Sequence, residues 1–482
     1  MARTGSSAHR VIPIVAAVPV PAGADEWVSL YAPGEKIYPR SVVGRFAKWR
    51  WVVVFLTQLV FYGMPWLEWG QRQMVLFDLG ARRFYIFGLV LYPQDFIYLA
   101  GLLIISALSL FLFTAVAGRL WCGYACPQTV YTEIFLWIER HTEGDRSARM
   151  RLDAGPLSAK KLARKGLKHL AWLTLAAWTG FTFVGYFTPI RELVSEVMAF
   201  NMGSWDMFWV GFYGLATYGN AGFMREQVCK HMCPYARFQS AMFDKDTLIV
   251  TYDAKRGEPR GPRSRTADPV ALNLGACVDC TLCVQVCPTG IDIRHGLQYE
   301  CIGCAACVDV CDTVMDKMGY ARGLVRYTTQ NALAQGSTAV SGLKSMFRPR
   351  VLVYGAILGT IVLGMLFSLA QRVPFKVDVV RDRGIMARVV NGGLIENLYR
   401  LQLMNATESP QTYRISASGL QGLTLASDAE AVVAPTESRW VVVRLRVPGV
   451  GLGPGSHPVK FEVDSVSSGE RVTEESVFFI PR

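Results

Sequence analysis

Eight of the twelve cysteines form one four-cysteine pattern that occurs twice. The first copy is Cys277, Cys280, Cys283 and Cys287, and the second, with the same spacing, is Cys301, Cys304, Cys307 and Cys311. This is the spacing of two-cluster ferredoxins, in which each [4Fe-4S] cluster takes three thiolates from one run and its fourth from the other. The pattern therefore predicts one cluster on Cys277, Cys280, Cys283 and Cys311, and a second on Cys301, Cys304, Cys307 and Cys287. The chemistry that such a pair of clusters supports is the transfer of single electrons.

Two other uses of these cysteines are weaker interpretations. Paired C-x-x-C motifs also bind structural zinc, but zinc sites seldom use four cysteines in one such run. A disulfide framework is disfavoured because the charge pattern, described below, assigns this segment to the reducing cytoplasm. Pro288 follows Cys287 as in ordinary ferredoxins, whereas Asp312 follows Cys311, so the second copy departs slightly from the usual ending.

The remaining four cysteines form two C-x-x-x-C-P pairs, Cys122 with Cys126 and Cys229 with Cys233. On a helical turn, residues four apart share one face, so each pair could present both sulfurs together. Lone cysteines in membrane helices are usually small packing residues. Because no cysteine of this chain lies outside these motifs, we predict a metal or redox role for all four. Four soft thiolates, with Met232 as a further candidate ligand, would favour Cu(I) over Cu(II).

Hydropathy indicates a membrane protein. The chain has 482 residues, 51% of them hydrophobic. The apolar segments of nearly membrane-spanning length are 51–67, 96–117, 170–187, 207–223 and 351–370. Lysine and arginine concentrate in 118–168 and 223–350 and are scarce in 68–93 and 188–204. The apolar segments predict about five spans. The positive-inside rule then predicts a cytoplasmic amino terminus and, with five spans, an external carboxyl terminus. The net charge of +12 is explained by this topology and by contact with the lipid bilayer, and we predict no nucleic-acid binding.

Composition divides the chain into five regions. Residues 1–48 are expected to be a cytoplasmic tail, because prolines interrupt the apolar run 11–20 that could otherwise be a signal peptide. Residues 49–255 should contain four spans and both C-x-x-x-C-P motifs, 256–345 a linker and the ferredoxin-type domain, and 346–372 the fifth span. The Gly, Pro and Arg-rich linker would let the ferredoxin domain dock or swing. Alternating apolar residues with frequent turn residues predict an antiparallel, immunoglobulin-like sandwich of roughly seven strands over 373–482.

With these residues in place, the chain resembles the cytochrome c oxidase accessory protein family, called CcoG, FixG or RdxA. The resemblance is carried by 30–40 in the tail, Trp121 through Thr129, Glu226 through Gln239, both four-cysteine runs, Met315 through Tyr327 and the carboxyl-terminal sandwich. It implies a multi-pass protein of the bacterial inner membrane, with a periplasmic carboxyl-terminal domain. It further implies that the C-x-x-x-C-P thiolates handle copper and that the protein helps to assemble a cbb3-type oxidase.

Three functions are compatible with these features. The first is a cupric reductase, in which an unknown cytoplasmic donor supplies electrons through the two clusters to copper held by Cys122, Cys126, Cys229 and Cys233. Its partners would be oxidase subunits or copper-delivery proteins. The second is a quinol-linked electron-transfer subunit, and the third is a non-catalytic assembly scaffold. The sequence leaves open whether the two C-x-x-x-C-P pairs meet within one chain or across a homodimer.

Overall fold

The computed structural model describes residues 36–336, 347–382, 384, 387–390, 392–449 and 453–481, without the side chain of Ser240. Most of the predicted cytoplasmic tail, including the family stretch 30–35, lies outside the described residues. From Tyr38 onward the described residues form one contact unit.

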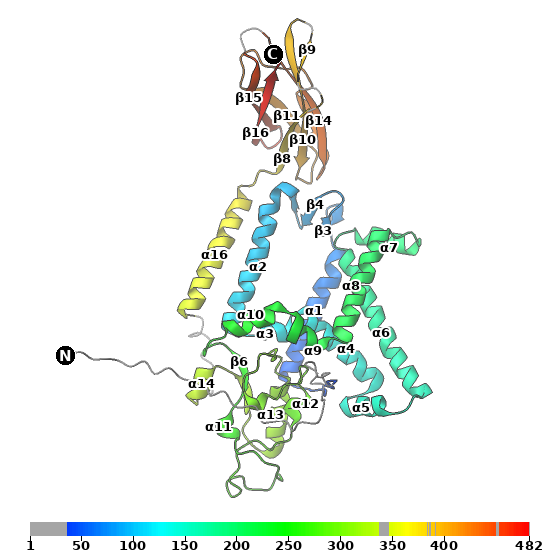
Figure 1. Cartoon of the computed structure of the whole chain (residues 1–482), viewed down its shortest axis with the longest axis vertical. Helices are drawn as coiled ribbons and strands as arrows, with labels where there is room; N and C mark the ends of the chain where they lie inside the picture. The colour runs from blue at the N-terminus through cyan, green and yellow to red at the C-terminus, as the bar shows by residue number, and fades with distance from the viewer. Residues whose placement is uncertain are drawn as a thin grey trace, which may run out of the picture. The chain divides into compact units, whose positions relative to one another are not determined.

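Long helices coincide with the five apolar segments of the sequence. They are α1 (Arg45–Gly63), α2 (Phe96–Ala117), α6 (Ala159–Val184), α8 (Ser204–Gly222) and α16 (Pro349–Ala370). Within the described residues, two helical stretches are long and apolar enough to cross a membrane, namely 93–117 and 349–370. These two helices, α2 and α16, pack side by side (Figure 1). The five-span bundle therefore stays a prediction, because α1 and α6 carry lysines and arginines in their first halves.

Shorter helices connect the long ones, and two of them begin at the prolines of the C-x-x-x-C-P motifs. They are α3 (Leu120–Tyr124), α4 (Pro127–Glu143), α5 (Arg146–Ala154), α7 (Ile190–Met198), α9 (Arg225–Gln227), a π-turn (Val228–Met232) and α10 (Pro234–Met242). Proline suits the first position of a helix because its fixed φ is already helical and its missing N–H needs no partner. These prolines therefore redirect the chain into new helices.

The loop 68–93, expected only as a connection, contains five short strands. They are β1 (Glu68–Trp69), β2 (Arg72–Gln73), β3 (Val75–Asp78), β4 (Arg83–Ile86) and β5 (Leu89–Leu91). The sheet β3-β4-β5 is antiparallel. Leu76, Tyr85 and Val90 of this sheet share a buried cluster with Met404 of the carboxyl-terminal domain. This small sheet thus bridges the helical part and the sandwich.

The segment between α10 and α16 is a small domain around both four-cysteine runs. Its elements are β6 (Ile249–Tyr252), α11 (Ala254–Gly257), α12 (Leu282–Gln285), a 3-10 turn (Ile293–His295), α13 (Ala306–Met318), β7 (Val325–Thr328) and α14 (Gln330–Ala334). Strands β6 and β7 pair antiparallel and bring the two ends of the domain together. Its core contains Val250, Ile293 and Met315 beside the cysteines.

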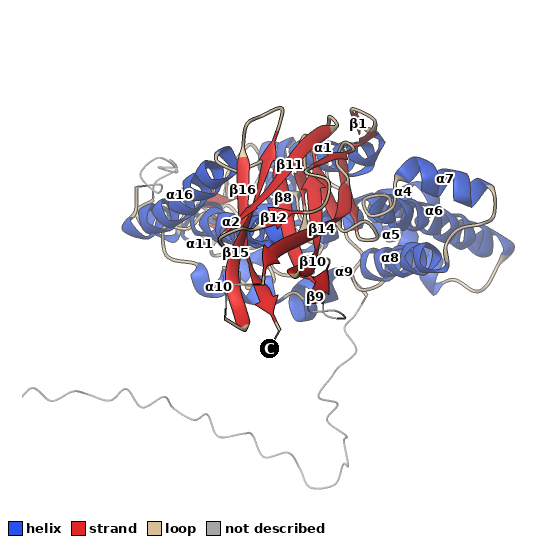
Figure 2. Cartoon of the chain, turned by 90° about the horizontal axis from the view of Figure 1, so that it is seen from above, coloured by secondary structure: helices blue, strands red, loops and turns tan. Residues whose placement is uncertain are grey.

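The carboxyl-terminal domain is a two-layer β-sandwich, whose strands are drawn red in Figure 2. Its strands are β8 (Phe375–Arg381), β9 (Arg388–Val390), β10 (Leu394–Asn405), β11 (Gln411–Ser418), β12 (Thr424–Leu425), β13 (Glu430–Val433), β14 (Ser438–Pro448), β15 (Gly455–Ser465) and β16 (Arg471–Ile480). One sheet has the order β12-β14-β10-β8, with β9 on β10, and the other has β13-β11-β15-β16. Alternate residues such as Tyr399, Leu401 and Phe461 fill the space between the sheets and are fully buried. The predicted sandwich is therefore present, with more short strands than expected.

Candidate functional site

The two four-cysteine runs line two neighbouring cavities. One cavity is lined by Cys277, Cys280, Cys283 and Cys311. The other is lined by Cys287, Cys301, Cys304 and Cys307, and Cys283 reaches both. In each cavity the fourth cysteine comes from the other run, which is the exchange that the ferredoxin rule requires. The donor set of each cavity, four thiols with mostly apolar neighbours, fits a [4Fe-4S] cluster.

The duplicated spacing is matched by a duplicated backbone. The residue after the second cysteine of each run, Thr281 in one and Ala305 in the other, has a left-handed φ, of 56° and 57°. Thr281 precedes α12, which contains Cys283 and leads to Cys287. Ala305 precedes α13, which contains Cys307 and Cys311. Left-handed φ is uncommon outside glycine, so its occurrence at both positions indicates that the loops are shaped around the thiols.

Burial controls the protonation of these thiols. It raises the pKa of Cys301 and Cys311 to about 12 each and that of Cys283 to about 11. Arg294 opposes the rise at Cys283. Iron–sulfur clusters bind thiolates, so loading must release protons from these buried groups. Among the described residues, no three His, Cys, Asp or Glu side chains converge on the position of a single metal ion.

The two C-x-x-x-C-P pairs lie in neighbouring parts of one chain. Cys122 and Cys229 pack against the same buried cluster of the ferredoxin-type domain. Burial raises the pKa of Cys122 to about 12, and the charges of Cys126 and Cys229 add to the rise. Burial also raises the pKa of Cys126, and the charge of Cys233 adds to that rise. We call these four residues the thiol quartet, and a metal site shared by all four stays a prediction.

The local structure of the thiol quartet differs from the helical-face interpretation. Cys122 lies in α3 and Cys229 in the π-turn, whereas Cys126 and Cys233 are the residues that cap α4 and α10. Both capping cysteines have non-helical ψ, 128° and 107°. The backbone stays helical up to the second cysteine of each pair, whose N–H donates to the carbonyl oxygen five residues earlier, at 3.0 Å for Cys126 and 2.8 Å for Cys233. The turn is therefore wider than an α-helical one, and the helix breaks at the second cysteine and not between the two. The proline after each pair begins the next helix and sets this break.

Two members of the thiol quartet lie beside the second four-cysteine run. Cys122 and Cys229 pack against the buried cluster that contains Ile302 and Cys304. The approach is close because Gly123 has no side chain: a Cβ there would lie 2.8 Å from the carbonyl oxygen of Ile302 and 2.9 Å from the backbone nitrogen of Cys304. The segment that carries Cys122 therefore packs directly on the ferredoxin-type domain.

Side chains that the sequence analysis did not single out hold this contact together. Arg119, only 6% exposed, donates hydrogen bonds to the carbonyl oxygens of Tyr299 and Cys301 and of Ala236 in α10. Tyr327 donates to the carbonyl oxygen of Gly303. Their signal in the sequence is weak, because an arginine after a hydrophobic span usually indicates only the cytoplasmic boundary.

Gln239 is a further neighbour of the thiol quartet. It is fully buried, and its Oε1 accepts a hydrogen bond from the Cys122 thiol at 3.2 Å. Met232, predicted as a further copper ligand, lies in the π-turn and is 57% exposed. Gln239 falls at the end of a stretch that carries the family resemblance, but nothing in its spacing indicated contact with a thiol.

The ferredoxin-type domain is docked on the helices. The carboxylate of Asp309 in α13 accepts hydrogen bonds from the backbone N–H groups of Phe46 and Ala47, at 3.1 and 2.8 Å, and so caps α1. The N–H of Arg40 donates to the carbonyl oxygen of Gln285 at 2.8 Å. The linker composition was expected to let the ferredoxin-type domain dock or swing, and in this structure the domain is docked.

Family models of iron–sulfur proteins and of FixG match three segments of the chain. A family model described as "4Fe-4S dicluster domain" matches residues 224–330, and one described as "4Fe-4S binding domain" matches 99–143, which contains Cys122 and Cys126. A third, described as "IG-like fold at C-terminal of FixG", matches 365–481. The dicluster match supports iron–sulfur clusters as the cofactors.

Full-length relatives agree with these matches. The chain is 40% identical to "Nitrogen fixation protein FixG" of Rhizobium meliloti over 82% of both chains. It is similar to "Protein RdxB" of Cereibacter sphaeroides, with 36% identity over 93% of this chain and 97% of the relative. It also resembles "Protein RdxA" of the same organism, with 37% identity over 82% of this chain and 84% of the relative. The resemblance predicted from the cysteine motifs is thereby confirmed, and the chain belongs to the FixG, RdxA and RdxB family of iron–sulfur redox proteins.

Proposed function

We propose that this protein is a membrane-bound oxidoreductase that reduces Cu(II) to Cu(I), with copper bound by the thiol quartet. The observation that carries the proposal is the packing of Cys122 and Cys229 against the buried cluster that contains Ile302 and Cys304. Two thiols of the proposed copper site thus adjoin a cavity suited to an electron carrier. The balanced reaction is the addition of one electron, from a cytoplasmic donor, to each Cu(II).

The cysteine side chains have distinct tasks in this proposal. Cys277, Cys280, Cys283 and Cys311 would hold one [4Fe-4S] cluster, and Cys287, Cys301, Cys304 and Cys307 the other. When bound, the clusters supply one-electron redox chemistry at low potential. Soft thiolates stabilise Cu(I) relative to Cu(II), which makes reduction of copper at the quartet favourable.

Neighbouring side chains position the thiol quartet. Gln239 orients the Cys122 thiol through the bond to its Oε1, and Arg119 fixes the loop of the second run against α10. Cys122 and Cys229 are half-buried, which limits the access of water to their sulfurs. This environment would protect Cu(I) from reoxidation until it is released.

The proposal includes a cellular setting. The protein would be a multi-pass protein of the bacterial inner membrane, with the ferredoxin-type domain in the cytoplasm and the sandwich in the periplasm. Its copper would serve the assembly of a cbb3-type oxidase, through oxidase subunits or copper-delivery proteins as partners. The family membership and the two apolar helices α2 and α16 support this setting.

The decisive experiment replaces Cys229 and Cys233 with serine in anaerobically purified protein. Copper reduction, followed with a Cu(I)-specific chelator and a chemical electron donor, should be abolished. The iron content and the visible absorption of the clusters should stay at the level of the parent protein, since neither residue lines a cluster cavity. Ala125→Ser, a half-buried change in the neighbouring loop, is the matched control. An undiminished rate in the double variant would reject the thiol quartet as the copper site.

One cavity bears on the quinol-linked alternative, which expects a quinone pocket near the C-x-x-x-C-P pairs. A cavity of about 830 Å³, lined by Phe183, Trp209 and Tyr213 among others, has the size of a small-molecule site. It lies near the start of α8, whereas Cys229 follows the end of that helix, about 25 Å away at 1.5 Å per residue, so it does not adjoin these pairs. Reduction of the clusters by a quinol, in a sample that does not reduce copper, would favour this alternative.

A further inference from the structure

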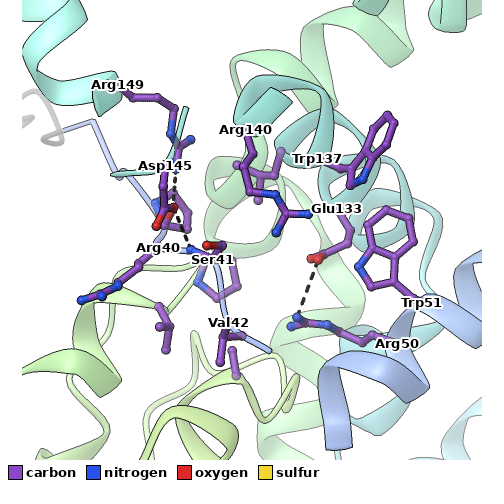
Figure 3. A pocket seen from close by; sticks show the side chains of 15 residues that line it. Arg40, Ser41, Val42, Arg50, Trp51, Glu133, Trp137, Arg140, Asp145 and Arg149 are labelled. Atoms are coloured by element: carbon purple, nitrogen blue, oxygen red, sulfur yellow. Dashed lines mark hydrogen bonds and ion pairs between the residues drawn. The ribbon is translucent and has the colours of Figure 1, made fainter. Parts of the chain in front are cut away.

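A second candidate site lies beside the ferredoxin-type domain and is separate from the thiol quartet. It is a cavity of about 70 Å³ between α1, α4, the segment 39–42 and residues Val286, Pro288 and Ala306 (Figure 3). The charged side chains that line it are Arg40, Arg50, Glu133, Arg140, Asp145 and Arg149. We call it the arginine pocket.

The carboxylates of the arginine pocket are already used. Asp145 accepts a hydrogen bond from the N–H of Ser41 at 3.0 Å. Arg149 is paired with Glu139, 2.7 Å away, which lies outside the lining. For Arg140 the described part of the chain provides no ion pair or side-chain hydrogen bond. The pocket therefore carries excess positive charge.

Arg50 has capacity for a further partner. Its side chain is only 7% exposed, and it forms an ion pair with Glu133 at 3.6 Å, a separation too long for a hydrogen bond. Its Nε is buried and has no hydrogen-bond partner among the described residues. Figure 3 shows the guanidinium groups of Arg50 and Arg140 directed toward the same space beside Glu133. A buried guanidinium with an unused N–H gains from a further acceptor.

We propose that the arginine pocket binds a phosphate-bearing anion through Arg50 and Arg140. Guanidinium groups bind phosphate oxygens in a bidentate manner, and the cavity has room for a tetrahedral oxyanion in place of several waters. Trp51 and Trp137 also line the cavity, with their rings 6.5 Å apart. This combination of arginine and tryptophan suits the headgroup of an anionic phospholipid at the membrane surface. Free phosphate carries the same oxyanion that the arginines would bind.

The bound anion would act on the second four-cysteine run. Val286 and Pro288 flank Cys287, Ala306 precedes Cys307, and all three line the pocket. Arg50 lines the same cavity, so its positive charge lies beside this run. An anion that neutralises Arg50 would make the neighbouring cluster harder to reduce. The proposal goes beyond copper reduction and does not depend on it.

Binding to the holoprotein tests the proposal, with two probes. Native mass spectrometry in detergent measures retention of added phosphatidylglycerol against phosphatidylcholine, and equilibrium dialysis measures radiolabelled inorganic phosphate. Arg140→Gln and Arg50→Gln should each weaken binding by about tenfold, the effect of one lost charge-assisted hydrogen bond. Arg151→Gln, on the exposed face of α5, removes the same charge outside the pocket and should leave binding unchanged.

The outcomes separate the two sources of phosphate. Retention of phosphatidylglycerol without affinity for inorganic phosphate identifies a lipid headgroup, and saturable binding of inorganic phosphate identifies a soluble anion. If Arg50→Gln fails to fold, Arg140→Gln alone decides. Absence of binding by both probes overturns the proposal, as does equal weakening by Arg140→Gln and Arg151→Gln, which would reflect general surface charge. Potentiometry without copper should show one cluster shifting to lower potential when the ligand is added.

Discussion

Gly123, next to Cys122, lies in close contact with the backbone of the ferredoxin-type domain, so Gly123→Ala tests this contact. The added Cβ would lie 2.8 Å from the carbonyl oxygen of Ile302, while ordinary contacts begin at 3.4 Å, so the backbones must separate by about 0.6 Å (3.4 − 2.8). Because both partners are backbone, we expect a cost near the upper end of overpacking, about 3 kcal/mol. The higher helix propensity of alanine returns about 1 kcal/mol, which leaves a net loss of about 2 kcal/mol.

A matched control is available at Gly166 in α6, where a Cβ would meet nothing within 4 Å. Gly166→Ala should stabilise by up to about 1 kcal/mol, so the two variants should differ by about 3 kcal/mol. Denaturant-induced loss of cluster absorption under anaerobic conditions measures this difference. The rate of copper reduction by Gly123→Ala should be lower than that of the parent protein even in samples with the same cluster content. If Gly123→Ala is as stable and as active as Gly166→Ala, the close contact described here is wrong.

Three further substitutions test the residues that dock the ferredoxin-type domain. Asp309→Asn weakens the cap on α1 and should cost about 1 kcal/mol in the same denaturation assay, whereas an unchanged midpoint would contradict the capping role. Arg119→Gln leaves buried carbonyl oxygens unpaired and should lower the free energy of unfolding by about 1–3 kcal/mol. The variant should therefore retain less iron after gel filtration, and an iron content equal to that of Arg151→Gln would contradict this. Tyr327→Phe removes the bond to Gly303 and should cost about 1 kcal/mol without changing iron content at rest, which protease protection of the domain can measure.

Much of the organisation could be predicted because it follows from local chemistry. The cysteine spacing indicated which thiols share a cavity, since the ligand geometry of a cubane cluster restricts the loop between them. The alternation of residues such as Tyr399, Leu401 and Leu403 indicated a sandwich, because a strand with one buried face must alternate. The long helices also matched the apolar segments.

The contacts between regions could not be predicted in this way. Residues 119–124 and 299–304 are far apart in sequence, and neither pattern indicates the other. The wide turn in each C-x-x-x-C-P pair, and the helix break at its second cysteine, were missed because the i, i+4 rule assumes a continuous α-helix, whereas Pro127 and Pro234 start new helices. The Nε of Arg50 lacks a hydrogen-bond partner because of what surrounds α1, and this has no local signature in the sequence.

The cap on α1 has a consequence for biosynthesis. The carboxylate that completes the first turn of α1 belongs to Asp309, which is 262 residues later in the chain than Ala47. The ribosome therefore releases α1 long before the residue that caps it has been synthesised. The first helix of the described chain is completed at its amino end only when the ferredoxin-type domain folds against it.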